Sequence, residues 1–396
     1  MHFYGYTNNQ FLMKSIGFNK PYLTGKEQEY IADAVESGKI SGDGKYTELC
    51  QDFFESNYGF KKCLLTTSCT DALEMASILI GIKPGDEIIA PSYTFVSTVN
   101  AFVLRGAKVI FCDSLPSHPC MDVNSIEKLI TKNTKAIVPV HYAGVACDMD
   151  ALMDLSKKYN LFVIEDAAQA IDNYYVNGKG VGVPLGSIGH MSTFSFHETK
   201  NIISGEGGML VINDDSFIKR AEIIREKGTN RSAFWRGEVD KYNWVDIGSS
   251  FLPSDIIAAF LYAQLECLGD IQSRRLDIWK QYNLELQELQ SKDLVKLPIV
   301  PEYSGNNAHM FYLICSDADE RNRLIQFLKQ FQINAVFHYL SLHKSPYYID
   351  KNDNSEALIY ADLYSDCLVR LPFSIDLESE QISYVCEKVS DFFNKR

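Results

Sequence analysis

Several common features are missing from the sequence, and each absence excludes a class of protein. It has no C-x-x-C pair, no run of 18 or more apolar residues, no internal repeat and no low-complexity tract. The ten cysteines are scattered over 396 residues, so we expect reduced thiols and a cytoplasmic location. No positively charged and then apolar segment opens the chain, so neither a secretory signal nor a membrane span is predicted.

Positive charge is also scarce. Lys and Arg number 38 against 51 Asp and Glu, which gives a formal net charge of -13. Nucleic acids and anionic membranes bind broad cationic surfaces, so we expect neither as a partner. A phosphate-bearing ligand would have to be held by a local arrangement of donors.

What is present is a long alternation of strand-like and helix-like segments. At 396 residues, with 46% hydrophobic residues, the chain is long enough for two domains. Near-continuous apolar runs separated by amphipathic helices predict an α/β fold with a mostly parallel sheet covered on both faces. The strand-like runs include KCLLTT, DEIIAP, AKVIFCD, TKAIVPVHY, LFVIEDAAQA, HMSTFSF and GMLVIND.

The pattern changes near residue 254. Residues 254–290 have the three- and four-residue apolar spacing of one long helix, and a second α+β segment follows. We therefore predict an extension at 1–14, a large cofactor-binding α/β domain at 15–260 and a smaller C-terminal α+β domain at 261–396. A helix near 25–37 is expected to pack across the boundary.

Parallel sheets bind ligands beyond the carboxyl ends of their strands, which directs attention to the residues there. In TTSCTDAL, Thr67, Ser68, Cys69 and Thr70 stand between a strand and a helix. Hydroxyls and free N–H groups at a helix start can cradle a phosphate. Taken alone, the stretch is more often ordinary Ser/Thr capping.

A second strand ends in Glu165 and Asp166. A carboxylate at the end of a buried strand is costly unless a cationic partner faces it. Asp166 suits a metal, a ribose or a protonated ring nitrogen. A helix-capping aspartate is an equally good interpretation of this stretch alone.

The stretch FSFHETKNIISGEGG, residues 194–208, comes within one residue of a zinc-binding His-Glu-x-x-His helix. Asn201 stands where the second histidine would be, and no other histidines form an i,i+4 pair, so we predict no metal site. Lys200, between a strand and glycines, is the better candidate, because a desolvated lysine amine is a nucleophile. Considered alone, it would be an exposed loop lysine.

Together, these three stretches match the requirements of pyridoxal 5′-phosphate. The helix start would hold the phosphate, Asp166 the ring nitrogen and Lys200 the aldehyde carbon. A nicotinamide-dependent oxidoreductase or a non-catalytic sugar-nucleotide binder is the alternative from a different class. The G-E-G-G at 205–208 argues against the former, because it is not G-x-G-x-x-G and opens no strand–turn–helix unit.

The sequence resembles the DegT/StrS family of sugar aminotransferases. The likeness runs from GFNKPYLTG to the C-terminus and is dense in SGKISGDGKYTELCQ, LLTTSCTDALEMA, VPVHYAGVACDMDAL, VIEDAAQ and FSFHETKN. The resemblance implies the type I fold of pyridoxal phosphate enzymes and a homodimer with active sites at the interface. Within the family, it is similar to transaminases that form dTDP-4-amino-4,6-dideoxygalactose from dTDP-4-keto-6-deoxyglucose and L-glutamate.

The resemblance also implies residue roles. Lys200 would bind the cofactor covalently and then carry protons, Asp166 would pair with the pyridine nitrogen, and Gln169 would contact the ring hydroxyl. The phosphate would be held by Ser68, Cys69, Thr70 and Ser195. Phe95 would stack on the ring, with a buried core aromatic as the alternative.

One departure concerns a phosphate contact across the dimer. Many members have an Asn in G-Y-N-x-R, whereas this chain reads GSSFLPS and has Ser250 at the Asn position. Cations in REKGTNRSAFWRG are candidates for the substrate's diphosphate or the donor's carboxylate, with a solvated helix end as the alternative, and His338 is a weaker candidate. These cations are Arg225, Lys227, Arg231 and Arg236.

Related activities stay open at this point. Amination giving the gluco epimer or a 3-amino sugar would use the same residues. A sibling class performs 3-dehydration, but it replaces the lysine by histidine, so Lys200 argues against it.

Overall fold

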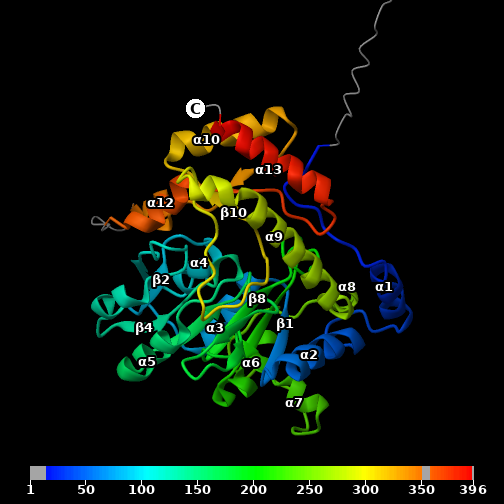
Figure 1. The fold of residues 1–396 in the computed structure, drawn as a ribbon. Coiled ribbons are helices and arrows are strands. Elements are labelled where there is room, and N and C mark those ends of the chain that lie inside the picture. The colour runs from blue at the N-terminus through cyan, green and yellow to red at the C-terminus, as the bar shows by residue number, and fades with distance from the viewer. Residues whose placement is uncertain (1–14, 350–356, 395–396) are drawn as a thin grey trace, which may run out of the picture.

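The computed structural model describes residues 15–349 and 357–394, so the predicted extension at 1–14 lies outside the described residues. Its centre is a seven-stranded sheet in the order β1-β9-β8-β5-β4-β2-β3 (Figure 1). Only β9 runs antiparallel to its neighbours, which confirms the mostly parallel sheet. The strands are β1 (Lys62–Thr66), β2 (Glu87–Pro91), β3 (Lys108–Cys112), β4 (Thr134–Ile137), β5 (Phe162–Asp166), β8 (Met191–Ser195) and β9 (Gly208–Ile212).

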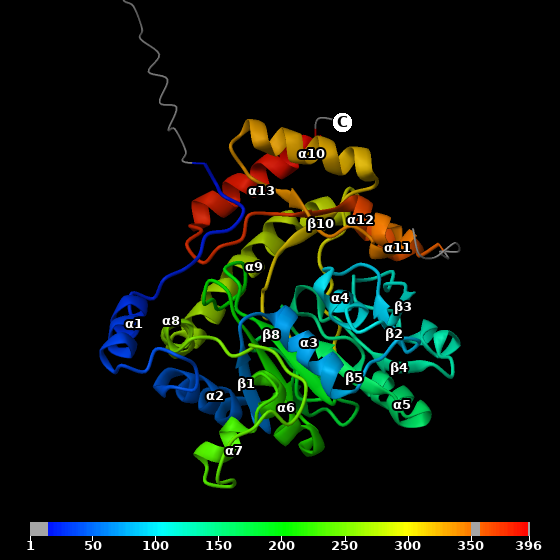
Figure 2. The same ribbon diagram turned by 180° about the vertical axis from the view of Figure 1, so that it is seen from behind.

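Helices flank this sheet, as Figures 1 and 2 show. All five residues of β2 and of β9 are buried, which is why these strands carry continuous apolar runs instead of alternating ones. The flanking helices are α2 (Lys45–Tyr58), α3 (Cys69–Leu79), α4 (Ser97–Val103), α5 (Met149–Tyr159) and α6 (Ile218–Arg225). A short hairpin of β6 (Tyr174–Val176) and β7 (Gly182–Pro184) lies outside the main sheet.

A second unit contains a three-stranded sheet in the order β10-β12-β11, covered by helices. Its strands are β10 (Tyr312–Ile314), β11 (Val336–Phe337) and β12 (Leu368–Arg370), and its helices are α10 (Ala318–Gln330), α12 (Ile359–Cys367) and α13 (Ser379–Asn394). It lies above the large sheet in Figure 1. The start of the described chain joins this unit, because the Ile16 N–H donates to Gln332 O at 2.9 Å. Residues near 16 were predicted to belong to the large domain, and this pairing differs from that prediction.

The single helix predicted over 254–290 is two helices, α8 (Asp255–Glu266) and α9 (Leu268–Ser291). Cys267 separates them with φ −106° and ψ 9°, outside helical geometry. α9 then crosses between two hydrophobic cores, since Ile271 packs in the larger core and Ile278 in the smaller one. The change of core therefore falls inside α9, a little later than the predicted boundary at 260.

The helix predicted near 25–37 is α1 (Glu27–Glu36), which packs against α8. Lys26 reinforces this contact by an ion pair with Glu266 at 2.9 Å. Within the described ranges, no helix combines the length and apolar character needed to cross a bilayer.

The sheet topology brings three predicted stretches to one edge. β1 and β8 are both antiparallel to β9 and therefore parallel to each other, and β5 is parallel to β8. The carboxyl ends of these three strands carry residues 67–70, 166–169 and 195–200. A ligand crevice is expected at this edge.

Candidate active site

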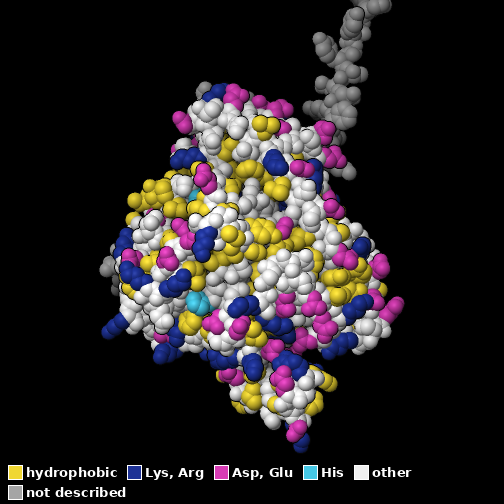
Figure 3. Space-filling model, turned by 60° about the horizontal axis from the view of Figure 1, so that its bottom comes forward, with side chains coloured by type: hydrophobic (Ala, Val, Ile, Leu, Met, Phe, Trp, Pro, Cys, Tyr) yellow, Lys and Arg dark blue, Asp and Glu magenta, His cyan; other side chains and the backbone are white. Residues whose placement is uncertain are grey.

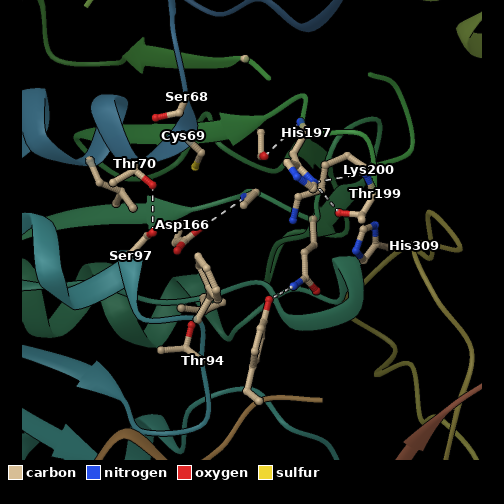
Figure 4. Close-up of a pocket in the computed structure, with 18 of the residues that line it drawn as sticks. Ser68, Cys69, Thr70, Thr94, Ser97, Asp166, His197, Thr199, Lys200 and His309 are labelled. Carbon is tan, nitrogen blue, oxygen red and sulfur yellow. Dashed lines mark hydrogen bonds between the residues drawn. The ribbon is translucent and has the colours of Figure 1, made fainter. Parts of the chain in front are cut away.

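A cavity of about 420 Å³ opens at this edge, and both units of the chain line it. Figure 4 shows Cys69 and Thr70 on one side, Asp166 in the middle, and Lys200 with His197 and His309 on the other. The predicted residues that line it are Ser68, Cys69, Thr70, Phe95, Asp166, Gln169, Ser195, Lys200 and His338. We call this cavity the Lys200 pocket.

Lys200 ends a tight turn that follows β8. Its N–H donates to His197 O at 2.9 Å, which folds the segment back toward the pocket. Burial lowers the pKa of the Lys200 amine, although Cys69 and Asp166 oppose the shift. In the described ranges the amine forms no ion pair. A lysine amine with a lowered pKa that faces a cavity is suited to act as a nucleophile and as a proton carrier.

Asp166 lies at the end of β5 with 5% of its surface exposed. Its Oδ2 accepts a hydrogen bond from Thr98 Oγ1 at 2.7 Å, and its Oδ1 accepts one from the Ala168 N–H at 3.2 Å. Burial raises the pKa of the Asp166 carboxyl, while these donors and Lys200 act in the opposite direction. A protonated nitrogen placed in the pocket would favour the ionised carboxylate.

Glu165 shows why the two adjacent carboxylates have different roles. Successive side chains of a strand point to opposite faces, so Glu165 faces away from the pocket. It accepts hydrogen bonds from the N–H groups of Gly186, Ile188 and Gly189 at 2.6–2.9 Å, and it lies 2.9 Å from His141 Nε2. Glu165 therefore fixes the end of β5 and leaves Asp166 to the ligand.

The start of α3 forms the hydroxyl-rich end of the pocket. Ser68 caps the helix by accepting from the Asp71 N–H at 3.0 Å, and Thr70 Oγ1 donates to Ser97 Oγ at 2.8 Å. The first N–H groups of a helix have no acceptor within the helix. A Cβ at Gly208 would lie 2.3 Å from Cys69 N, so only glycine lets β9 approach this helix start. The arrangement suits a phosphate.

Gln169 and Phe95 reach the pocket from the large unit and meet Tyr339 from the small one. Gln169 Nε2 donates to Tyr339 OH at 3.0 Å, and its Oε1 accepts from the Ala143 N–H at 2.7 Å. The Phe95 ring lies 5.9 Å from the Tyr339 ring and is 55% exposed. That exposure excludes the alternative of a buried core aromatic for Phe95.

His338 is held by Tyr142, whose hydroxyl lies 2.6 Å from His338 Nδ1. Burial, with the nearby charges of Arg370 and Lys200, lowers the pKa of His338 well below its usual value. The imidazole is therefore neutral. It packs against the ring of Tyr339 with centroids 3.6 Å apart.

Asn201, at the position of the missing zinc ligand, has a structural role. Its Nδ2 donates to Gln272 Oε1 at 2.8 Å and to Asn307 O at 2.9 Å, and its Oδ1 lies 2.8 Å from His309 Nδ1. His309 Nδ1 must then carry the proton. Nowhere in residues 15–349 and 357–394 do three His, Cys, Asp or Glu side chains group as metal ligands.

Five predicted residues lie outside the Lys200 pocket. They line a separate cleft, which we call the Arg225 cleft, and are Arg225, Lys227, Arg231, Arg236 and Ser250. Arg225 is only 4% exposed and pairs with Asp43 at 2.7 Å. Asp43 thus gives the Arg225 guanidinium a carboxylate partner inside the fold, and the contact of Arg225 with the substrate stays a prediction.

Several residues of the pocket were not predicted. They include Ser97, His309 and Arg370, and Thr98 contributes from outside the lining through its hydrogen bond to Asp166. Ser97 and Thr98 stand two and three residues after the predicted Phe95, so their hydroxyls offered a signal. Arg370 ends β12 of the small unit, and nothing in the local sequence places it against Lys200.

The sequence of the chain is similar to those of known aminotransferases. The model of the DegT/DnrJ/EryC1/StrS aminotransferase family matches residues 21–390. The chain belongs to this family. A GDP-perosamine synthase of Escherichia coli O157:H7 is 34% identical over 388 residues, which cover 97% of this chain and 100% of the relative.

Solved structures agree with this assignment. Spr1654 of Streptococcus pneumoniae, solved in PLP and PMP forms, is 25% identical, covers 96% of this chain and 99% of its own, and gives TM-scores of 0.86 and 0.87. NtdA of Bacillus subtilis with bound PMP is 25% identical, with a TM-score of 0.83 over 94% of this chain and 83% of its own. The protein is therefore a pyridoxal phosphate-dependent sugar aminotransferase, and the alternative of an oxidoreductase or a mere binder is wrong.

The described residues fit the cofactor. The pocket offers a buried carboxylate at Asp166 and a partly desolvated amine at Lys200. It also offers the start of α3, which β9 can approach closely because residue 208 is a glycine. Ser68, Thr70 and Ser195 would hold the phosphate, Asp166 the ring nitrogen and Lys200 the aldehyde carbon. Bound pyridoxal phosphate supplies an electron-withdrawing ring that stabilises negative charge next to the transferred nitrogen.

Proposed function

We propose that the enzyme transfers the amino group of L-glutamate to C4 of dTDP-4-keto-6-deoxy-D-glucose. The products would be dTDP-4-amino-4,6-dideoxygalactose and 2-oxoglutarate. The observation that carries this proposal is Lys200 beside Asp166 in one pocket, with the sequence likeness to the dTDP-sugar transaminases of the family. A lysine at position 200 argues against the dehydrating sibling class, which has a histidine there.

The chain's own residues account for the proton transfers. Lys200 Nζ would accept the proton from Cα of the donor and, in the second half-reaction, deliver a proton to C4 of the sugar. Burial lowers the pKa of this amine, which favours its neutral form, the form that accepts a proton in the first half-reaction. Asp166 would hold the ring nitrogen protonated throughout.

The nucleotide is the point that most needs testing. The resemblance favours a dTDP-linked sugar, whereas the E. coli relative at 34% identity carries the name GDP-perosamine synthase. A GDP-linked keto sugar is therefore the second candidate. The gluco epimer and a 3-amino sugar are the alternative products on the dTDP-linked substrate.

Exposed apolar side chains support the proposed homodimer. Figure 3 shows hydrophobic side chains gathered in a band across one face of the molecule. Phe95 and Val96 beside the Lys200 pocket are at least half exposed, as are Trp235 and Trp244 near the Arg225 cleft. Side chains of this size are usually covered. Ser250 lies outside its own subunit's pocket, so its proposed phosphate contact would be made in the partner.

The cysteines support the proposed cytoplasmic location. All ten lie within the described residues and none is joined in a disulfide, and eight of them are buried. Reduced, buried thiols are usual in a reducing compartment.

Product analysis tests the proposal directly. The purified holoenzyme is incubated with L-glutamate and either dTDP-4-keto-6-deoxyglucose or a GDP-linked 4-keto-6-deoxy sugar, and the product is examined by NMR. We expect an axial C4 amine on the dTDP-linked sugar. Turnover of the GDP-linked sugar alone, an equatorial amine, or an amine at C3 would each contradict the assignment and identify the alternative.

A further inference from the structure

One cation in the Lys200 pocket has no assigned role. Arg370 ends β12 of the small unit and lines the pocket together with Tyr339 and His338. Its guanidinium lies 4.6 Å from the centre of the Phe18 ring. Within residues 15–349 and 357–394 it makes no ion pair and donates no hydrogen bond, and its Nε is buried without a partner.

A second buried arginine shows what a satisfied guanidinium looks like in the same unit. Arg275 lies over the Phe373 ring at 4.9 Å, as Arg370 lies over Phe18. Arg275, however, also donates to Ala308 O at 3.1 Å and to His309 O at 2.7 Å. Leaving a guanidinium without acceptors is costly, so the unpaired state of Arg370 requires a reason other than folding.

We propose that Arg370 binds the α-carboxylate of the amino donor. This inference rests on the proposed transamination and names the group that recognises the first substrate. A guanidinium offers several N–H donors in a planar fork that matches a carboxylate. Arg370 therefore supplies an unpaired cation that can bind the carboxylate of an amino acid in a partly desolvated pocket.

Charge assigns Arg370 to the donor and not to the sugar. Lys200 and Arg370 are the only Lys or Arg among the described residues that line this pocket, and Lys200 is used for the cofactor. The acidic side chains of the lining are Asp166 and Glu206. A keto sugar carries its charge on the diphosphate, away from C4, whereas an amino acid has its carboxylate on the reacting carbon. Only the donor half-reaction therefore requires a cation here.

The location on the small unit is consistent with this role. Arg370 lies opposite Val336 and Tyr312 in the three-stranded sheet, so its backbone is fixed on both sides. The neutral His338 and the Tyr339 hydroxyl, which is bonded to Gln169, add no competing negative charge. The Arg370 guanidinium therefore remains free to bind an anionic group in the pocket.

The test separates the two half-reactions in the holoenzyme. Arg370→Met keeps the side-chain length and removes the charge. We expect the rate with L-glutamate to fall about tenfold to a hundredfold or more, as for loss of a charged hydrogen-bond pair. The rate with 4-aminobutyrate, which is glutamate without its α-carboxylate, should be equal in the wild type and the variant. The step in which the aminated enzyme meets the keto sugar should change little.

A binding measurement complements the rates. α-Methyl-L-glutamate has both carboxylates but no proton to lose at Cα, so its dissociation constant reports binding without turnover. Calorimetric titration should show a weakening of tenfold or more in Arg370→Met, with partial recovery in Arg370→Lys. Equal losses with glutamate and 4-aminobutyrate, or unchanged affinity for the methylated donor, would overturn the proposal.

Stability provides the control for a purely structural role. Because Arg370 has no acceptor to lose, Arg370→Met should melt at the same temperature as the wild type or higher, whereas Arg275→Met should melt lower. A marked loss of stability in Arg370→Met would instead assign the side chain to the fold. Failure of the wild type to aminate a dTDP-linked sugar would sink the proposed sugar substrate alone, since the glutamate half-reaction can be followed without any sugar.

Discussion

The Lys200 pocket and the Arg225 cleft both collect cations, but they treat them differently. In the Arg225 cleft the four predicted cations face carboxylates: Arg225 pairs with Asp43, Lys227 and Arg231 with Glu226, and Arg236 with Glu222, at 2.7–3.9 Å. In the Lys200 pocket neither cation of the described lining has an ion-pair partner within the described ranges. A buried cation that the fold leaves unpaired is therefore a better guide to a ligand site than a positive residue in the sequence.

The same contrast extends to the carboxylates. Glu165 is satisfied by three backbone N–H groups and is a structural residue. Asp166, its neighbour, is buried with an upward-shifted pKa and faces the cavity. A charged group that the fold buries without a partner of opposite charge is the one that a bound ligand can stabilise.

The largest expected effect comes from Lys200→Ala. We expect this variant to retain cofactor by its phosphate and ring contacts, but without the covalent bond that borohydride reduces in the wild type. Turnover should fall by roughly 10²–10⁴-fold, the usual contribution of a positioned acid–base group. Stopped-flow absorbance with L-glutamate measures the loss.

The matched control is a lysine from the Arg225 cleft. Lys227→Ala should retain turnover, since its amine is exposed and faces Glu226. Wild-type turnover in Lys200→Ala would remove Lys200 from the proton transfers and end the contrast between the two sites.

Asp166→Asn should show a smaller loss of activity and a gain of stability. Replacing a charged partner of the ring nitrogen removes about 1.5–3 kcal/mol, so we expect the rate to fall about tenfold to a hundredfold. In the cofactor-free protein the carboxyl pKa is raised by burial, so ionised Asp166 destabilises the fold.

The pH dependence gives the sign of that stability effect. A raised acid pKa contributes stability that is present below the unfolded pKa and is lost as pH rises through the folded pKa. At neutral pH, cofactor-free Asp166→Asn should therefore melt above the wild type, and the difference should shrink as pH falls through the folded pKa. A stability difference that grows on acidification would show that Asp166 is stabilised as the carboxylate.

The local sequence was sufficient to predict which residues lie at the ligand-binding edge of the sheet, because these residues closely follow the ends of strands. Ser68, Asp166 and Lys200 each stand within five residues of a strand end, and parallel topology brings such ends together. The break at Cys267 was not predictable, because apolar spacing continues across it and the two cores that α8 and α9 serve are separate.

The contribution of Arg370 to the pocket was not predictable for a different reason. Arg370 lies about 170 residues beyond Lys200 and reaches the pocket only through packing of the two units. The ion pair of Arg225 was equally hidden from local sequence, because its partner Asp43 is 182 residues earlier in the chain. Local pattern identifies a charge but not whether a distant segment neutralises it.

Arg225→Met gives the smallest expected effect on activity and sharpens the comparison from the other side. The substitution leaves Asp43 and Gln51 without their partner, so the free energy of unfolding should fall by about 1–3 kcal/mol. This loss is smaller than for a fully buried ion pair, because Asp43 keeps contact with water.

Urea denaturation measures the loss. The control is Arg236→Met, in a more exposed ion pair, for which the free energy of unfolding should change by less than about 1 kcal/mol. Turnover per folded enzyme should stay within about twofold of the wild type in both variants. A raised KM for the sugar nucleotide with unchanged stability would instead make Arg225 a substrate contact and the cleft a second ligand site.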